Sequence, residues 1–527
     1  MASPTHSKID DSTSIDQDEV QLAQLGYKQT LHRSWHQIES FAASFCALNF
    51  IGGVRSAFFL GILAGGPAAL WSSYLITIVF MIITAAVLAE ICSALPLSGS
   101  IYIWAAESAG PKYARLVGFT VAWWSCTAWM TFVASNCQAT ANYLVSLLAV
   151  YEVDFPGGID NSNIKWRAFI WAVSEVLLVI SIAINYLPPR WYSGVFKFAI
   201  FIIMLDFFLC LIWLPIGVSK TYGFRTAKEA FLTTYNGTGA PPVWNWFLSF
   251  LFTAGTLTGF DASGHIAEET KNASVVAARG ILSSAIATAI GGFITAILFL
   301  FCTPDFDTLF ALDAPQPFVQ IYALALGKGG AVFMTILAAV GLILNSSIAI
   351  IAASRLIFAV ARDGVLPGSH WIGRVSGDGQ PRNAVTVMFV FAASLLCVIL
   401  PSQVAFTSLV SAAGIPTIAA YGLIALLRLT LTPDSFGSSH FHLGKFRKLF
   451  YLCAAVFNAV VFSVDISPFS FPVTAETFNF ACAIFGAITV FGLLSWWLLP
   501  EEKWLRQAHL THAKQTADAP EQPVVQT

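Results

Sequence analysis

The chain has 527 residues, of which 57% are hydrophobic and only 11% are Asp, Glu, Lys or Arg. A soluble domain carries about 25% charged residues, so this chain lacks the polar surface that keeps a soluble protein dispersed. The formal net charge of -2 argues against a nucleic-acid partner, because phosphate binding needs a basic surface. The composition therefore predicts a polytopic membrane protein and excludes a disordered chain or an ordinary soluble enzyme.

The nine cysteines lie mostly inside apolar runs, and none forms a CxxC pair. Isolated cysteines in apolar helices usually behave as small hydrophobic residues. We therefore expect no disulfide framework, no metal site and no other cofactor. The segments 1–36 and 500–527 are polar and are expected to be tails, which the basic residues discussed below place in the cytoplasm. The first has no basic region followed by an apolar one, so we expect no cleavable signal peptide.

The region between the tails predicts membrane-spanning helices. A helix rises about 1.5 Å per residue, so about 20 apolar residues cross the hydrocarbon layer. By this measure, 37–499 forms one domain of twelve spans. We expect them at 38–63, 67–94, 113–149, 166–187, 193–218, 243–267, 279–302, 331–360, 383–401, 403–429, 448–467 and 477–499.

The basic residues predict the orientation. With a cytoplasmic N-terminus, 20 of the 27 Lys and Arg residues lie on the cytoplasmic side, six lie outside, and Arg55 lies inside the first span. Positive charge collects on the cytoplasmic side, so both termini are expected there. Asn236, in Asn236-Gly-Thr238, then faces outward and is a candidate glycosylation site. We expect the plasma membrane, with the vacuolar membrane as the alternative.

Two spans carry glycine and charge at mid-membrane depth. The first contains Asn49–Arg55 (NFIGGVR), and the sixth contains Gly255–His265 (GTLTGFDASGH). Close helix packing is one explanation for such glycines. Interrupted helices that free backbone groups to bind a substrate are the other, and they mark the central site of many transporters. Two such spans, each with a charge, favour a substrate site.

Three motifs in chain order carry a resemblance to a known family. They are Leu88–Tyr102 (LAEICSALPLSGSIY), Gly259–Asn272 (GFDASGHIAEETKN) and Arg355–Pro367 (RLIFAVARDGVLP). With them, the chain resembles the amino acid-polyamine-organocation superfamily of secondary transporters. Within it, the chain is most similar to the fungal amino acid/choline permeases, which carry GABA, other amino acids, choline and related amines.

The resemblance implies an all-α integral membrane fold of twelve helices. Five helices would be repeated in inverted orientation, as in LeuT-like transporters, and two peripheral helices would follow. Spans one and six would cross at the centre, with spans three and eight beside them. The chain departs from many relatives at Arg55, because their first helix has a glycine-rich stretch without a charge.

The candidate substrate-binding residues lie at the two breaks. They are Asn49, Gly52, Gly53, Arg55, Gly259, Phe260 and Asp261. An unpaired charge at the bilayer centre costs at least about 2.5–3.5 kcal/mol. We therefore expect Arg55 and Asp261 to line one cavity, paired with each other or with the two ends of a zwitterionic substrate; a purely structural ion pair is the alternative. Asn136 and Asn345 are further candidate lining residues.

Titratable residues near the sixth span suggest coupling and gating. A carboxylate in a partly dry cavity can load and release a proton, so Asp261 is the first candidate proton carrier. His265, four residues on and on the same helical face, is the second. After the span, Glu268, Glu269, Lys271 and Arg279 are expected to form a cytoplasmic gate.

These features predict a secondary active permease for amino acids or small amines such as GABA. It would work by proton symport and alternating access around helices one and six, with the substrate, protons and the bilayer as partners. The alternative within the class is a carrier, or an exporter, of choline, another organic cation or an alkaloid-like amine. A P-loop is absent, which argues against an ATP-driven pump. A channel, an intramembrane enzyme and a non-transporting nutrient sensor are alternatives from other classes.

Overall fold

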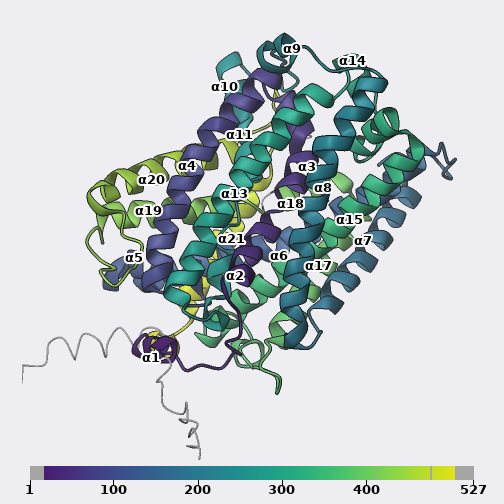
Figure 1. The fold of residues 1–527 in the computed structure, drawn as a ribbon. Helices are drawn as coiled ribbons and strands as arrows, with labels where there is room; N and C mark the ends of the chain where they lie inside the picture. Colours follow the sequence, from purple (N-terminus) through teal and green to yellow (C-terminus); the bar gives the residue numbers. More distant parts are fainter. Residues whose placement is uncertain (1–16, 412, 475–476, 505–527) are drawn as a thin grey trace, which may run out of the picture.

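The computed structural model describes residues 17–411, 413–474 and 477–504; the rest of the predicted tails lies outside these ranges. The described part is a bundle of long helices (Figure 1). Its helices are α1 (Gln17–Gln24), α2 (Gln37–Leu48), α3 (Phe50–Leu63), α4 (Gly66–Ala94), α5 (Ser100–Ser108), α6 (Gly110–Val150), α7 (Ile164–Ile184), α8 (Tyr192–Lys220), α9 (Ala227–Leu232), α10 (Pro242–Leu248), α11 (Phe250–Gly255), α12 (Ala262–His265), α13 (Ala273–Cys302), α14 (Phe306–Phe310), α15 (Pro317–Arg362), α16 (Ser369–Ile372), α17 (Arg382–Leu396), α18 (Gln403–Ser411), α19 (Ile415–Thr430), α20 (Arg447–Asp465) and α21 (Ala481–Leu498).

Eleven helical stretches of the described chain are long and apolar enough to cross a membrane. They are α2 with α3, α4, α6, α7, α8, α13, α15, α17, α18 with α19, α20 and α21. The predicted sixth span is divided among α10, α11 and α12, so none of its pieces has the length of a complete span. The twelve predicted crossings are therefore eleven such stretches and one interrupted crossing.

The bundle has two distinct ends. In Figure 1, α9, α10 and α14 lie at one end and α1 lies at the other. Since α1 precedes the first span, its end is the cytoplasmic one in the predicted orientation. In the centre, α15 packs on α6 and α8, and α13 packs on α4 and α2. Figure 1 shows α19 and α20 at one edge of the bundle.

The first span is interrupted at Asn49, three residues before the glycines predicted to break it. Asn49 has φ 40° and ψ 64°, a left-handed conformation that asparagine tolerates better than most residues. Its side chain accepts a hydrogen bond of 3.4 Å from the Gly52 N–H and caps α3. A Cβ atom on Gly52 would lie 2.7 Å from Asn49 Nδ2. Gly52 therefore makes room for the cap, and both Gly52 and Gly53 lie within α3.

A glycine with positive φ follows a short helical segment after both the second and the seventh spans. After α4, the short helix α5 leads to Gly110 (φ 68°) and then to the long helix α6. After α13, the first turns of α15 lead to Gly327 (φ 75°), where the helix kinks before its long remainder. Glycine adopts positive φ without steric cost, so each residue can turn the chain between helices. The two glycines occupy corresponding positions in the first and the second five-helix halves. The backbone therefore shows a relation between the halves that their residue patterns do not show.

Hydroxyl groups join α2 to α12. Ser44 Oγ donates to the Phe260 carbonyl at 2.5 Å, and the Ser263 N–H donates to Ser44 Oγ at 2.8 Å. Ser263 Oγ donates to the Ser40 carbonyl at 2.6 Å. The cytoplasmic halves of the two interrupted spans are thus bonded to each other through backbone groups as well as side chains.

Candidate functional site

A cavity of about 570 Å³ lies where the two interrupted spans meet α6 and α15. Asn49, Gly52 and Gly53 line it from the first span, and Gly255 lines it from the sixth. It extends to Phe478, which is 41% exposed in the loop between α20 and α21. The same loop contacts the predicted outer loop around Asn236, because the Phe471 N–H donates to the Thr238 carbonyl at 2.7 Å. The cavity therefore opens toward the predicted outer face.

Two asparagines hold the inner wall of this cavity. Asn345 of α15 donates to the carbonyls of Cys46 at 2.5 Å and Ala47 at 2.8 Å, at the end of α2. Asn136 of α6 donates to Asn345 Oδ1 at 2.6 Å. The last carbonyls of a helix have no partner within it, and lipid supplies none. The asparagines satisfy these groups, so the predicted lining role of both coincides with a structural one.

Arg55 does not meet Asp261. Its Nη2 lies 2.8 Å from each carboxylate oxygen of Asp206 on α8, and the side chain has no exposed surface. The guanidinium also faces the rings of Tyr143 and Tyr322, with centroids 5.8 and 5.6 Å away. The expected pairing of Arg55 with Asp261 is wrong, because α3 turns Arg55 toward α8 and away from the sixth span. Neither residue lines the 570 Å³ cavity.

Asp261 belongs to a separate buried cluster just before α12. His265 Nε2 lies 3.0 Å from Asp261 Oδ2, and the Tyr421 hydroxyl of α19 donates to Asp261 Oδ1. Ser100 Oγ lies 2.5 Å from His265 Nδ1. Phe260 is fully buried and stacks on Tyr421 with ring centroids 4.9 Å apart. The predicted proton carriers are thus adjacent, and they connect the sixth span to α5 and α19.

Gly259 and Trp129 line a smaller adjoining cavity of about 250 Å³. Gly259 has φ 120°, in the region that glycine alone adopts easily, where the chain between α11 and α12 is not helical. Two other tryptophans of α6, Trp123 and Trp124, point away from both cavities. Trp123 stacks on Phe491, and Trp124 Nε1 donates to Thr489 Oγ1 at 2.9 Å, so both face α21.

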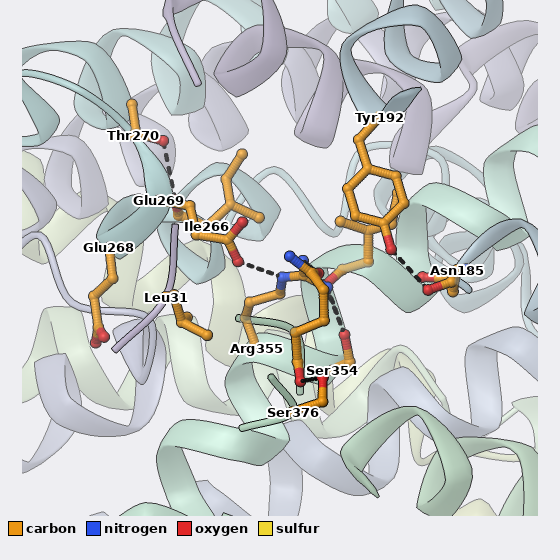
Figure 2. A network of polar contacts seen from close by, with 12 residues as sticks. Leu31, Asn185, Tyr192, Ile266, Glu268, Glu269, Thr270, Ser354, Arg355 and Ser376 are labelled. Carbon is orange, nitrogen blue, oxygen red and sulfur yellow. Dashed lines mark hydrogen bonds and ion pairs between the residues drawn. The ribbon is translucent and has the colours of Figure 1, made fainter. Parts of the chain in front are cut away.

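Below the sixth span, two acids and two arginines form a buried cytoplasmic ion-pair cluster, which consists of Glu268, Glu269, Arg355 and Arg362. Arg355 Nε lies 2.8 Å from Glu269 Oε1, as Figure 2 shows. Arg362 donates from Nη1 and Nη2 to Glu268 at 2.9 and 3.0 Å. Burial raises the pKa of Glu269, and the Arg355 charge acts in the opposite direction. The cluster closes the central space between the helices at the end opposite to the cavity.

Of the four residues predicted to form a cytoplasmic gate, Glu268 and Glu269 form ion pairs, with Arg355 and Arg362. Lys271 and Arg279 are exposed, and neither forms an ion pair with another described residue. The arginines of the cluster lie on α15 instead, in the third sequence motif. Arg355 and Arg362 are seven residues apart, which places them two turns apart on one helical face. This spacing, together with two consecutive glutamates elsewhere in the chain, was the sequence pattern from which the two ion pairs could have been predicted.

The chain before the first span runs beneath this cluster. The Trp35 N–H donates to the Glu269 carbonyl at 3.0 Å, and the Lys271 N–H donates to the Trp35 carbonyl at 2.8 Å. Gln29 Nε2 donates to the Glu268 carbonyl at 3.0 Å. The predicted cytoplasmic end is therefore closed by an N-terminal segment as well as by ion pairs.

Asn236, the candidate glycosylation residue, is exposed in the loop between α9 and α10. Its Nδ2 donates to the Ala240 carbonyl at 2.8 Å, and Thr238 Oγ1 donates to Asn245 Oδ1 at 2.7 Å. Glycosylation stays a prediction.

Two interrupted spans around an outward-opening cavity, with a buried charge cluster at the other end, are the architecture of a secondary transporter. Residues 37–488 match the amino acid permease family, and the chain belongs to it. It is therefore a transporter of the predicted superfamily, and not an enzyme. Membership of the GABA and choline group within the superfamily stays a prediction.

Comparison with individual proteins adds two relatives and one structure. The chain is 46% identical to the thiamine transporter thi9 of Schizosaccharomyces pombe, over 94% of this chain and 87% of that protein. It is 28% identical to the amino-acid permease BAT1 of Arabidopsis thaliana, over 93% and 96%. The structure of an Eremococcus coleocola manganese transporter with an aromatic bis-isothiourea substituted compound matches with a TM-score of 0.53 and 11% identity, over 90% and 95%. This likeness confirms the predicted LeuT-like helical fold.

Proposed function

We propose that this protein takes up a small organic solute from outside by alternating access around the two interrupted spans. The observation that carries the proposal is the asymmetry of the central path. A cavity of about 570 Å³ opens outward, within the range of about 300–1,000 Å³ typical of small-molecule sites. The opposite end is closed by the cytoplasmic ion-pair cluster.

Thiamine is the first substrate to test, because the chain shares 46% identity with a thiamine transporter along most of both proteins. Amino acids such as GABA are the second candidate, because the family and the Arabidopsis relative bear the name of amino acid permeases. Choline and alkaloid-like amines stand beside thiamine as positively charged solutes. We place the protein in the plasma membrane as an importer; the vacuolar membrane and export are the alternatives.

The first experiment is radiolabelled thiamine uptake by yeast cells that lack their own thiamine uptake and express the full chain. Saturable uptake, competed by excess thiamine and not by GABA, supports the first candidate. Gly52→Ala should abolish uptake, because its Cβ would meet the Asn49 side chain that caps α3. Gly486→Ala is the matched control, since nothing lies within 4 Å of a Cβ there. No thiamine uptake, together with saturable uptake of radiolabelled GABA or alanine, would transfer the assignment to the amino acids.

We further propose that uptake is coupled to protons through the buried cluster of Asp261 and His265. The contact of 3.0 Å between them lets one proton be shared, and Tyr421 ties the carboxylate to α19. Other groups that face the pair are Ser100 on α5 and the ring of Trp129 on α6. Movement of α12 against α19 would change these contacts and so the hold on the proton.

Asp261→Asn tests the coupling. The variant should lose substrate accumulation driven by an outside-acid gradient while it keeps substrate exchange across the membrane, which needs no net proton movement. Asp307→Asn, an exposed change of the same charge on the outer face, should leave both activities unchanged. Loss of exchange together with accumulation would assign Asp261 a structural role.

A further inference from the structure

Asp465, the last residue of α20, is distinguished by its place in the cavity. It is half-buried and lines both the 570 Å³ cavity and the adjoining one. Among the described residues that line either space, it is the one with an acidic or basic side chain. The buried acids nearby are bonded, Asp206 to Arg55 and Asp261 to His265 and Tyr421. The Asp465 carboxylate has no hydrogen bond or ion pair with a described residue.

When it is ionised, Asp465 adds to the negative potential at the carbonyl end of α20. The carbonyl end of a helix carries partial negative charge, so an acid at the end of α20 is unfavourable unless a cation comes near. Asn479 Nδ2 donates to the Asp465 carbonyl at 2.8 Å and to the Ser467 carbonyl at 2.7 Å, and both amide protons are used there. The neighbouring asparagine therefore cannot neutralise the carboxylate, and no basic side chain among the described lining residues can do so.

The remaining walls fit an organic cation. Phe132, Phe469 and Phe478 line the same cavity, and Trp129 lines the adjoining space. Aromatic faces attract cationic nitrogen and cover the apolar part of a ligand. A divalent metal is a poor fit, since it takes about four or more ligands, and the described residues contain no group of three His, Cys, Asp or Glu able to hold one.

We propose that Asp465 is the cation-recognition residue of the outward-opening cavity, whose ligand is a small organic cation with a positively charged nitrogen and an apolar body. The inference rests on the proposed function and names the ligand class of the same cavity. It places charge recognition on α20, a peripheral helix outside the ten-helix core, and not on the charged residues at the helix breaks.

Binding to the purified full chain in lipid nanodiscs tests the inference separately from transport. The probes are thiamine, choline and 3,3-dimethylbutan-1-ol, which is choline with carbon in place of the charged nitrogen. We expect at least one of the two cations to raise the thermal midpoint in a saturable way and the neutral alcohol to leave it unchanged. Asp465→Asn should weaken cation binding by about tenfold or more, because it removes an ionic partner from a site of low polarity.

Two further variants serve as controls for this inference. Asp465→Glu should recover most of the affinity, which separates charge recognition from a defect in folding. Asp307→Asn, on the same face of the membrane and outside the cavity, should bind as the wild type does. The inference is overturned if neither cation binds the wild type, if the alcohol binds as tightly as choline, or if Asp465→Asn keeps wild-type affinity. Cation binding through Asp465 without uptake would instead reject the proposed transport function and leave the inference standing.

Discussion

At the predicted outer end of the bundle, the Asp465 carboxylate lines a cavity without a bonded partner among the described residues. At the predicted cytoplasmic end, four charged side chains pair with one another. Glu268, Glu269 and Arg355 are each 1% exposed. Buried ion pairs hold neighbouring helices together, whereas an unpaired charge that solvent can reach is available to bind a ligand. The comparison indicates that the ion-pair cluster stabilises the state in which the cavity is open, and that the Asp465 carboxylate is available there to bind a ligand.

The Arg55–Asp206 pair is expected to behave like the cytoplasmic end, as structure and not as ligand site. Arg55→Ala leaves a buried carboxylate without its cation, and breaking such a pair costs about 3–5 kcal/mol. We expect loss of folded protein at the cell surface, measured by surface labelling and thermal unfolding. Replacing both residues by leucine should recover much of the stability. Normal surface levels of Arg55→Ala with a large rise in KM would return Arg55 to the substrate site.

The cytoplasmic ion-pair cluster is expected to set the balance between the outward-open and inward-open states. Arg355→Ala removes a charged hydrogen bond from Glu269, worth about 1.5–3 kcal/mol, and should open the cytoplasmic end. Hydrogen exchange should rise in 266–272 and in the segment before α2. Arg447→Ala is the matched control, because its pair with Asp434 is exposed and should contribute less than about 1 kcal/mol. Equal exchange in both variants would remove the gating role of the cluster.

Asn345→Ala should have the smallest effect of the three. It frees the carbonyls of Cys46 and Ala47, but water in the 570 Å³ cavity, which Asn345 lines, can replace part of the lost bonding. We expect about 1 kcal/mol of weaker substrate binding, seen as a rise of about fivefold in KM with kcat nearly unchanged. A fall in kcat at constant KM would show that Asn345 acts in the conformational change and not in shaping the cavity.

The sequence predicted the features that depend on local pattern. Hydrophobic length identified the spans, glycine content located the break in the sixth span, and polar residues in apolar runs identified Asn49, Asn136 and Asn345. The interruption of the first span was displaced by three residues, because asparagine can take the left-handed conformation that glycine was expected to supply.

Contacts between distant helices could not be predicted in the same way. Which partner Arg55 meets depends on how α3 is rotated about its axis, and twelve helices allow many such arrangements. Asp206 and Asp465 therefore gave no signal beyond being acids at the membrane, one on the fifth span and one at the end of the eleventh. The pairing of Glu269 with Arg355 was recoverable in part, because the periodicity of the two arginines on α15 is local.

The serine bonds between α2 and α12 have a mechanical consequence. Three hydrogen bonds through Ser44 and Ser263 make the two half-helices one body, so they have fewer independent degrees of freedom than two separate rods. We expect a displacement of either half-helix to be passed to the other through these bonds. Substrate contact with one interrupted span would thus be felt by both, and the protein would need a single trigger to start its cycle.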